Sequence, residues 1–313
     1  MTALDESIVG SVLALCTQTP GARRGAGPMS WRGELKQLRR CGFSRVDLLD
    51  SWLPFAQLTA SEIDDLGSIL AELGLTAPCL GTSRRSVIDP ELGEENLEYT
   101  VKILEVAHRL GLRKVGVGFH PALIDVQRES AQFWEHAGPA DHRTDENWDI
   151  AARRLAVVCD AAANLDINVN IELYEDSLLC TSDDATRLMA AVDRTNFGVN
   201  PDLGNLVRSV TPLRESWLDT FRGCLPHTTY WHLKNYTRST LAAGGPFAVA
   251  PTALGDGAID YRLAVKEALR AGYTGPMVVE HYGGDALWMQ ERSAEYLRRL
   301  VDELRNDERE EQQ

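Results

Sequence analysis

Apolar and polar positions along the chain follow two alternating patterns. Short runs rich in apolar and β-branched residues are expected to form strands, because most are too short for helices and are bounded by turn-forming residues. Between them lie longer segments whose apolar positions recur every three or four residues, as on one face of a helix. The expected strands are residues 8–16, 45–49, 75–80, 114–119, 167–173, 196–200, 229–233 and 276–280. The expected helices are residues 31–41, 60–73, 94–110, 147–165, 182–192, 213–221, 261–271 and 286–304.

Residues that favour helix ends support several of these boundaries. Gly42, Gly74 and Gly111 follow the first three expected helices. Glycine is common at such positions because it adopts the left-handed conformation without steric cost. Thr59 or Ser61 is expected to cap the second helix, since a short hydroxyl side chain accepts a hydrogen bond from the first helical turn.

Eight strands in regular alternation with helices predict a parallel sheet covered by helices. The number eight favours closure into a (β/α)₈ TIM barrel over an open, doubly wound sheet. No G-x-G-x-x-G pattern follows the first strand, which argues against a dinucleotide-binding fold. We expect one barrel domain over residues 1–305, a glycine- and proline-rich loop at 244–257, and a charged C-terminal tail at 306–313.

Composition excludes several classes of protein. The chain has 313 residues and a formal net charge of −14, which argues against broad contact with a phosphate backbone, so no nucleic-acid partner is expected. Its six cysteines form no C-x-x-C pair and are expected to be free thiols. No apolar run is long enough to span a bilayer and no signal peptide is recognisable, so we expect no membrane partner and a cytoplasmic location.

Four neighbouring strands end in residues that bind metals. They are Glu172, Asp202, His232 and Glu280, at the ends of the fifth to eighth expected strands. In a barrel of this type the carboxyl ends of the strands form the active-site face. Each of these groups follows an apolar run, where an unpaired charge is costly, and one shared cation would neutralise the acids. The pattern predicts a site for a single divalent metal ion.

The donor set of three carboxylates and one imidazole selects among metals. Hard oxygen ligands with one nitrogen suit Mn²⁺, Co²⁺, Mg²⁺ or Fe²⁺, and Zn²⁺ less typically, because the set contains no thiolate. Mn²⁺ is the first expectation.

The same pattern of Glu, Asp, His and Glu resembles the xylose-isomerase-like TIM-barrel superfamily of sugar isomerases and epimerases. The segments HLKN at 232–235 and VVEH at 278–281 are similar to its strands seven and eight. The resemblance implies proton transfer next to a ketone through an enediolate, with Glu172 and Glu280 as both metal ligands and catalytic groups. One position departs from the pattern: Asn205 stands where many sugar epimerases of the family have a histidine. Asn205 can still bind substrate but cannot act as a base.

Other polar residues near the expected strand ends are weaker candidates. His120 and His142 lie in the long polar loop after the fourth strand and are possible proton-transfer groups, since histidine titrates near neutral pH. Lys234 and Trp231, beside His232, are expected to contact substrate. His281 follows Glu280 and should point to the other face of its strand, so we expect a structural role.

Two main functions remain open from the sequence. The first is a metal-dependent isomerase or epimerase of a keto-sugar. The alternative is a lyase on an oxidised sugar, in particular the catalytic α-subunit of a C-glycoside deglycosidase, to which the resemblance also extends. That branch implies a 3-oxo-glycoside substrate and a small β-rich partner subunit. In either case we expect an oligomer, and a non-catalytic metal- or sugar-binding protein is a weaker third possibility.

Overall fold

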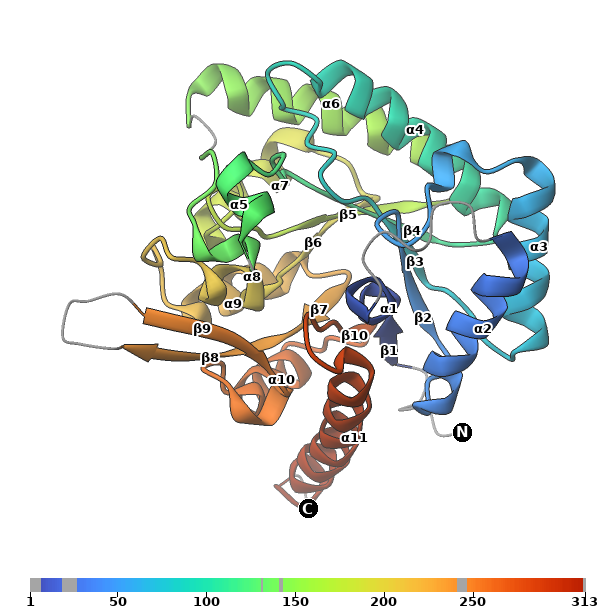
Figure 1. The fold of residues 1–313 in the computed structure, drawn as a ribbon. Coiled ribbons are helices and arrows are strands. Elements are labelled where there is room, and N and C mark those ends of the chain that lie inside the picture. The colour runs from blue at the N-terminus through green and yellow to red at the C-terminus, as the bar shows by residue number, and fades with distance from the viewer. Residues whose placement is uncertain (1–6, 19–26, 131, 141–142, 241–246, 312–313) are drawn as a thin grey trace.

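The computed structural model describes residues 7–18, 27–130, 132–140, 143–240 and 247–311 of the chain. Eight parallel strands surround a central axis and helices cover them on the outside (Figure 1). In chain order the barrel strands are β1 Ile8–Ser11, β2 Val46–Leu49, β3 Cys79–Gly81, β4 Lys114–Gly118, β5 Asn168–Glu172, β6 Phe197–Asn200, β7 Trp231–Leu233 and β10 Met277–Val279. The predicted (β/α)₈ TIM barrel is confirmed.

Pairing of the strands closes the sheet on itself. Hydrogen bonding runs in the order β6-β5-β4-β3-β2-β1-β10-β7, and all of these pairs are parallel. A parallel bridge between Val199 and Thr228 joins β6 to the start of β7. All eight carboxyl ends therefore open at the same face of the barrel.

Helices cover the outside of the barrel, and the longer ones bury an apolar face against it. Those described are α1 Leu13–Gln18, α2 Gly27–Arg40, α3 Ala60–Glu72, α4 Gly93–Arg109, α5 Asp125–Glu129, α6 Asp145–Ala163, α7 Ser182–Val192, α8 Leu203–Arg208, α9 Trp217–Cys224, α10 Tyr261–Arg270 and α11 Ala286–Glu311. Thr59 caps α3 in a reciprocal capping box with Glu62, and Gly42, Gly74 and Gly111 have φ of +82°, +62° and +74°. The predicted helix-ending glycines and the Thr59 cap are confirmed.

Four local predictions are corrected. The expected first strand, residues 8–16, ends at Ser11, and its second half forms α1. The helix expected at 213–221 begins at Trp217, and the short helix α8 precedes it. Part of the expected loop at 244–257 belongs to an antiparallel hairpin of β8 Asn235–Thr240 and β9 Phe247–Thr252, outside the barrel. α11 continues to Glu311, into the segment expected as a tail.

Two further expectations concern the cysteines and helices that could span a membrane. All six cysteines are free thiols, as predicted. Within the described ranges, no helix is long and apolar enough to cross a membrane.

Candidate metal centre and active site

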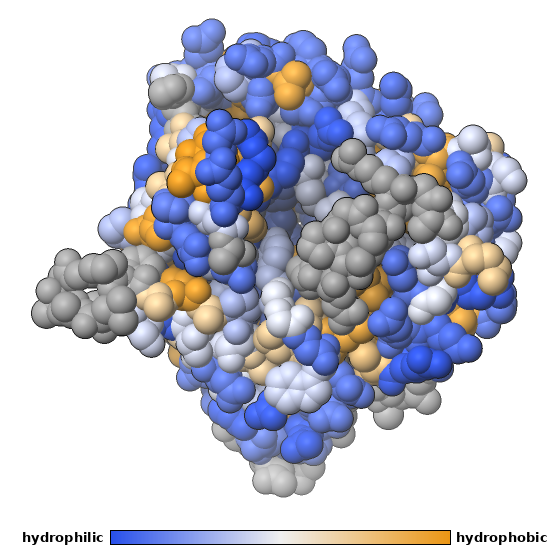
Figure 2. Space-filling model, viewed as in Figure 1, coloured by the Kyte–Doolittle hydropathy of each residue, from blue (hydrophilic) through white to orange (hydrophobic). Residues whose placement is uncertain are grey.

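Alternate residues of the barrel strands point into a central cavity. Tyr230, His232 and Lys234 do so from β7 and its end, and Glu280 and Tyr282 do so from the end of β10. This period of two follows from the pleat of a β-strand. The cavity is open to solvent. Figure 2 shows a hollow near the centre of the molecule in the same view as Figure 1.

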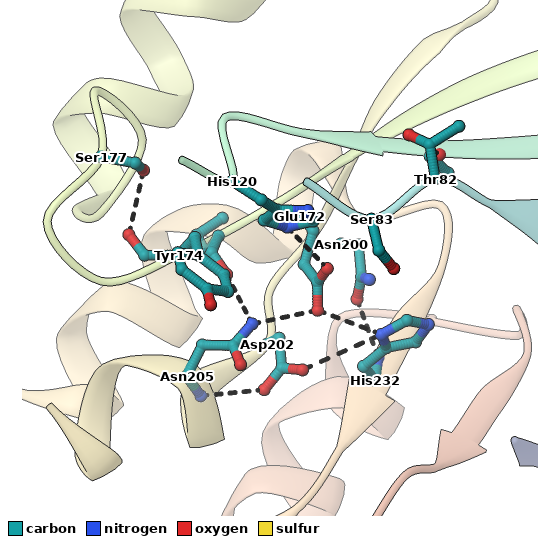
Figure 3. Close-up of polar contacts among 12 residues, drawn as sticks. Thr82, Ser83, His120, Glu172, Tyr174, Ser177, Asn200, Asp202, Asn205 and His232 are labelled. Carbon is teal, nitrogen blue, oxygen red and sulfur yellow. Dashed lines mark hydrogen bonds and ion pairs between the residues drawn. The ribbon is translucent and has the colours of Figure 1, made fainter. Parts of the chain in front are cut away.

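The four predicted metal ligands converge in this cavity. Glu172, Asp202, His232 and Glu280 each offer one donor atom, and these atoms lie within 4.8 Å of one another. Nδ1 of His232 is 3.1 Å from Oε1 of Glu172 and 3.8 Å from Oδ2 of Asp202 (Figure 3). It is 3.7 Å from Oε2 of Glu280. The ends of strands β5, β6, β7 and β10 therefore bring together groups spread over residues 172–280 of the sequence.

The electrostatics of this cluster fit a divalent cation. Burial raises the pKa of Asp202 to about 7, although the ammonium of Lys234 opposes the rise. Burial alone would lower the pKa of His232, but Glu280 and Glu172 outweigh it and raise that pKa to about 10. Three carboxylates in so small a buried space repel one another, and a cation with two charges relieves that repulsion. The donor set of oxygens and one imidazole nitrogen is suitable for such an ion.

Lys234 also neutralises part of this negative charge. Its Nζ lies 2.8 Å from Oδ2 of Asp202 and closer still to Oε2 of Glu280, and its side chain is almost fully buried. Next to Asp202, Gly204 makes room for it, because a Cβ at Gly204 would lie 2.1 Å from Cγ of Lys234. The ammonium is thus held against two ligands at the edge of the cluster.

Asp47 of β2 lies behind His232. Its Oδ2 is 3.6 Å from Nε2 of His232 and has no hydrogen-bond partner, while its Oδ1 accepts a 2.5 Å hydrogen bond from the hydroxyl of Tyr230. The backbone N–H of His232 donates to Oδ1 of Asn200 at 2.8 Å. Histidines that bind metals usually donate their second ring N–H to a carboxylate, which fixes the tautomer. Asp47 is placed to keep the proton of His232 on Nε2 and leave Nδ1 for the cation.

This placement makes a prediction about metal affinity. Replacing Asp47 by Asn should weaken Mg²⁺ or Mn²⁺ binding by about 10- to 100-fold, because His232 loses the carboxylate that orients it. Isothermal titration calorimetry on the folded variant measures the change. Tyr230→Phe is the matched control, since it removes only the hydrogen bond to Oδ1 and should have a smaller effect. Unchanged affinity in Asp47→Asn would contradict the assigned role.

His120 lies in the cavity at the end of β4. Its Nε2 is 3.0 Å from Oε2 of Glu172, and its ring lies 4.5 Å from the ring of Tyr174, centroid to centroid. Gly118 permits this position, because a Cβ there would lie 2.3 Å from Nε2 of His120. His120 and His232 together lower the pKa of Glu172 well below its usual value, against the effect of burial, which raises it. His120 therefore contacts the second oxygen of a predicted ligand.

Asn205 links the start of α8 to the same glutamate. Its backbone N–H donates to Oδ1 of Asp202 at 3.1 Å, so this ligand is also the N-cap of the helix. Its side-chain amide donates to Oε1 of Glu172 and to the carbonyl of Leu173, both at 3.0 Å. Two acceptors fix the orientation of the amide, and its oxygen is left buried without a partner.

The remaining predicted residues lie elsewhere. Trp231 points away from the cavity and packs against Phe221 of α9, with ring centroids 4.6 Å apart. Its predicted role in substrate binding is therefore corrected to packing, as expected for a residue one position from the inward-facing His232. His281 is buried and lies 3.0 Å from Oγ of Ser293, in α11. His142 falls outside the described residues, so its role stays a prediction.

Several residues around the cavity were not anticipated. Asp47, Ser83 and Arg84 line it, and they come from β2 and from the segment after β3, on the side of the barrel opposite the predicted ligands. Asp47 could have been predicted from the sequence. It is an acid inside the apolar run RVDLL, and such a residue is expected to point into the barrel. Ser83 and Arg84 follow a strand in an ordinary polar loop and have no comparable signal.

Comparison with known proteins places the chain in a family. A family model described as "Xylose isomerase-like TIM barrel" matches residues 35–304. The chain belongs to the xylose isomerase-like TIM barrel family. The resemblance inferred from the strand-end residues is thereby confirmed.

Three known proteins are similar to most of the chain in sequence or in structure. A xylose isomerase-like TIM barrel protein from Mycobacterium smegmatis, solved in complex with magnesium, is 34% identical, with a TM-score of 0.86 over 95% of this chain and 97% of that one. A ketose 3-epimerase of Arthrobacter globiformis is 24% identical over 263 residues, which are 82% of this chain and 79% of the relative. A D-allulose 3-epimerase from Methylomonas sp. has a TM-score of 0.68 and 17% identity, over 94% of this chain and 97% of that one.

Proposed function

We propose that this protein is a divalent-metal-dependent isomerase or epimerase that acts on a keto-sugar. One observation supports this proposal most directly. Four side chains converge in an open cavity with donor atoms within 4.8 Å of one another: Glu172, Asp202, His232 and Glu280. The ketose 3-epimerase of Arthrobacter globiformis, 24% identical over 82% of this chain, supports the reaction class. The Mycobacterium smegmatis relative, solved with magnesium, supports a divalent cation.

The chemistry requires removal of a proton next to a ketone. When bound, a divalent cation polarises a carbonyl group and makes the neighbouring C–H more acidic. Oε2 of Glu280 contacts Lys234, whereas Oε1 has no hydrogen-bond partner within the described part of the chain. We assign Glu280 as the base that takes the proton, whose bonding electrons move onto the carbonyl oxygen to give an enediolate. Return of a proton to the same or the adjacent carbon completes an epimerisation or isomerisation.

Glu172 is the second proton-transfer group in this proposal. Oε1 of Glu172 lies on the side of His232 and Asn205, and Oε2 contacts His120. His120 can exchange a proton with Glu172, because Nε2 and Oε2 are within hydrogen-bond distance. Two acids on opposite sides of a planar enediolate would allow the proton to return to the opposite face.

Two further side chains are proposed to orient substrate. The amide oxygen of Asn205 has no partner and is buried at the cavity wall, so it can accept a hydrogen bond from a sugar hydroxyl. The ammonium of Lys234 hydrogen-bonds to Glu280 and forms an ion pair with Asp202, and its three N–H groups leave a donor for a substrate oxygen. Neither residue needs to change its protonation state.

Proton exchange provides the direct test of the proposed function. Neutral and acidic keto-sugars are incubated with the protein and Mn²⁺ in D₂O, and products are followed by NMR. We expect an epimeric ketose or isomeric aldose that carries deuterium at the carbon that changed, and loss of both signals with a chelator. Complete absence of exchange and product across this set, with the cation bound, would overturn the proposal.

We propose Mn²⁺ as the preferred ion. Mn²⁺ accepts an imidazole nitrogen as a ligand more readily than Mg²⁺ does. Mg²⁺ favours six oxygen ligands. At equal concentration, Mn²⁺ should therefore raise the thermal unfolding midpoint further than Mg²⁺, because the ion that binds more tightly stabilises the native state more. Differential scanning fluorimetry with a chelator-treated sample measures both shifts. A larger shift with Mg²⁺ would reverse this order.

A lyase on an oxidised sugar is the second candidate function. The observation that favours it is His120, which lies 3.0 Å from Glu172 and can donate a proton to a leaving group. Removal of the proton at C2 of a 3-oxo-glycoside, followed by loss of the C1 substituent, uses the same first step. Release of an aglycone from 3-oxo-glycosides, with or without a small β-rich partner subunit, would distinguish this function from epimerisation.

A further inference from the structure

Arg84 lies at the mouth of the cavity, three residues beyond the end of β3. It lines the same cavity as Glu172 and His232. Its backbone has φ of +58°, in the left-handed region that a residue with a Cβ adopts only at a cost in free energy. Such conformations persist where the surrounding structure holds them, and they are enriched at ligand sites.

Two aromatic rings and one carbonyl hold the guanidinium of Arg84. Its Cζ lies 4.7 Å from the ring centre of Phe133 and 5.4 Å from that of Tyr174. One terminal nitrogen donates to the carbonyl of Pro121 at 2.9 Å. Across the described residues no carboxylate pairs with Arg84, whereas the neighbouring Arg208 pairs with Glu175. Arg84 thus keeps N–H donors and a full positive charge without an anionic partner.

The two cationic side chains of the cavity differ in their partners. The ammonium of Lys234 lies against Asp202 and Glu280, whereas no carboxylate of the described residues pairs with the guanidinium of Arg84 at the mouth. Ser83, its neighbour, also lines the cavity, and both its backbone N–H and its hydroxyl interact with the carboxylate of Asp50. Figure 3 shows this hydroxyl pointing inward, toward the side of the site where His232 lies.

We infer that the keto-sugar taken by this site carries a carboxylate group, bound by the guanidinium of Arg84. This inference rests on the proposed function. A guanidinium offers two parallel N–H donors that match the two oxygens of a carboxylate. Phosphate is disfavoured, because phosphate sites are typically built from helix N-termini or glycine-rich loops. Arg84 itself lies outside any helix start or glycine-rich loop, since the next helix, α4, begins only at Gly93.

Comparison of three related ligands tests the inference. D-fructose, D-fructose 6-phosphate and the matching 6-carboxylate, D-fructuronate, are titrated into the full chain saturated with Mg²⁺, and dissociation constants are measured by calorimetry. Wild-type protein should bind fructuronate at least about 10-fold more tightly than fructose, as expected for a charged hydrogen-bonded pair. In Arg84→Gln this ratio should fall to near one, and in Arg84→Lys it should be intermediate. Circular dichroism checks that both variants fold.

Arg85→Gln is the matched control for these variants. Arg85 is adjacent in sequence, but its guanidinium lies over the ring of Tyr99, 4.2 Å from its centre, and does not line the cavity. The fructuronate preference should persist in this variant. An equal preference in wild type and Arg84→Gln, or tighter binding of the phosphate than of the carboxylate, would overturn the inference. If Arg84-dependent binding of fructuronate occurs without proton exchange on any sugar, the proposed function fails and the inference stands.

Discussion

Replacing Asp202 by alanine is expected to abolish specific binding of a divalent cation and, with it, turnover. Asp202 is fully buried, and its Oδ2 lies 3.8 Å from Nδ1 of His232 and 2.8 Å from Nζ of Lys234. Without this carboxylate, the cation loses a charged ligand and Lys234 loses one of its two partners. The affinity for Mn²⁺, measured by calorimetry, should fall by more than about 100-fold, beyond the loss that follows changes outside the ligand shell.

Asp202→Asn separates metal binding from folding. Asp202 is also the N-cap of α8, and losing that cap costs about 1 kcal/mol of stability. Asparagine is an equally good cap but a neutral and weaker metal ligand. We therefore expect Asp202→Asn to keep the apo-protein close to wild-type stability while still binding Mn²⁺ poorly.

Asp302→Asn is the matched control for these two variants. Asp302 is an exposed carboxylate of α11, far in sequence from the cluster, and its replacement should leave the affinity for Mn²⁺ unchanged. Wild-type affinity in both Asp202 variants would show that the cation, if bound, is held somewhere else.

The fold and the convergence of the four strand-end residues were predictable because both depend on local pattern. An apolar run followed by one polar residue marks the carboxyl end of a barrel strand, and the barrel brings such ends together. Glu172 and Glu280 follow this rule directly. Asp202 lies just beyond its strand, and the rule held because the chain turns at once into α8, where Asp202 is the cap.

Elements with an ambiguous pattern were predicted less well. Residues 8–16 are apolar almost throughout, and periodicity cannot distinguish a buried strand from a buried helix in such a run. α8 has six residues, including Gly204 and Asn205, which have low helix propensity, yet contacts with Glu172 and Leu173 hold it in place. In both segments, tertiary contacts rather than local sequence determine the secondary structure.

The contributions of distant loops to the site could not be predicted at all. Arg84 reaches the cavity because its backbone adopts a left-handed conformation and two rings hold its guanidinium. Neither the conformation nor the rings are visible in the sequence, since Phe133 and Tyr174 come from different segments. The sequence thus predicts which strand ends carry chemistry, but not which loop residues select the substrate.

A second large effect is expected on stability, at the ion pair between Arg208 and Glu175. Nε of Arg208 lies 2.8 Å from one oxygen of Glu175, and a terminal nitrogen lies 3.0 Å from the other. The side chain of Arg208 is fully buried, and that of Glu175 is only 10% exposed. Burial would lower the pKa of Arg208, but Glu175 outweighs it and raises the pKa well above its usual value. Arg208 therefore stays charged in the core.

Replacing Glu175 by Gln should leave that charge buried without its partner. Breaking a buried ion pair in this way costs about 3–5 kcal/mol of unfolding free energy, measured by chemical denaturation. Arg208→Met combined with Glu175→Gln should cost less, because no unpaired charge remains. The exposed pair Arg262–Glu303 is the control, and Glu303→Gln should change stability by less than about 1 kcal/mol.

The same pair positions the segment that covers the mouth of the barrel. Cζ of Arg208 lies 4.7 Å from the ring centre of Phe133 and 5.4 Å from that of Trp134, both in the loop after β4. Phe133 in turn contacts Arg84. Arg208→Met, which removes the guanidinium, should therefore loosen this loop and weaken binding of an acidic sugar as well as lowering stability. A destabilisation in Glu175→Gln no larger than that in Glu303→Gln would show that water or another group compensates Arg208, and the loop would then need another anchor.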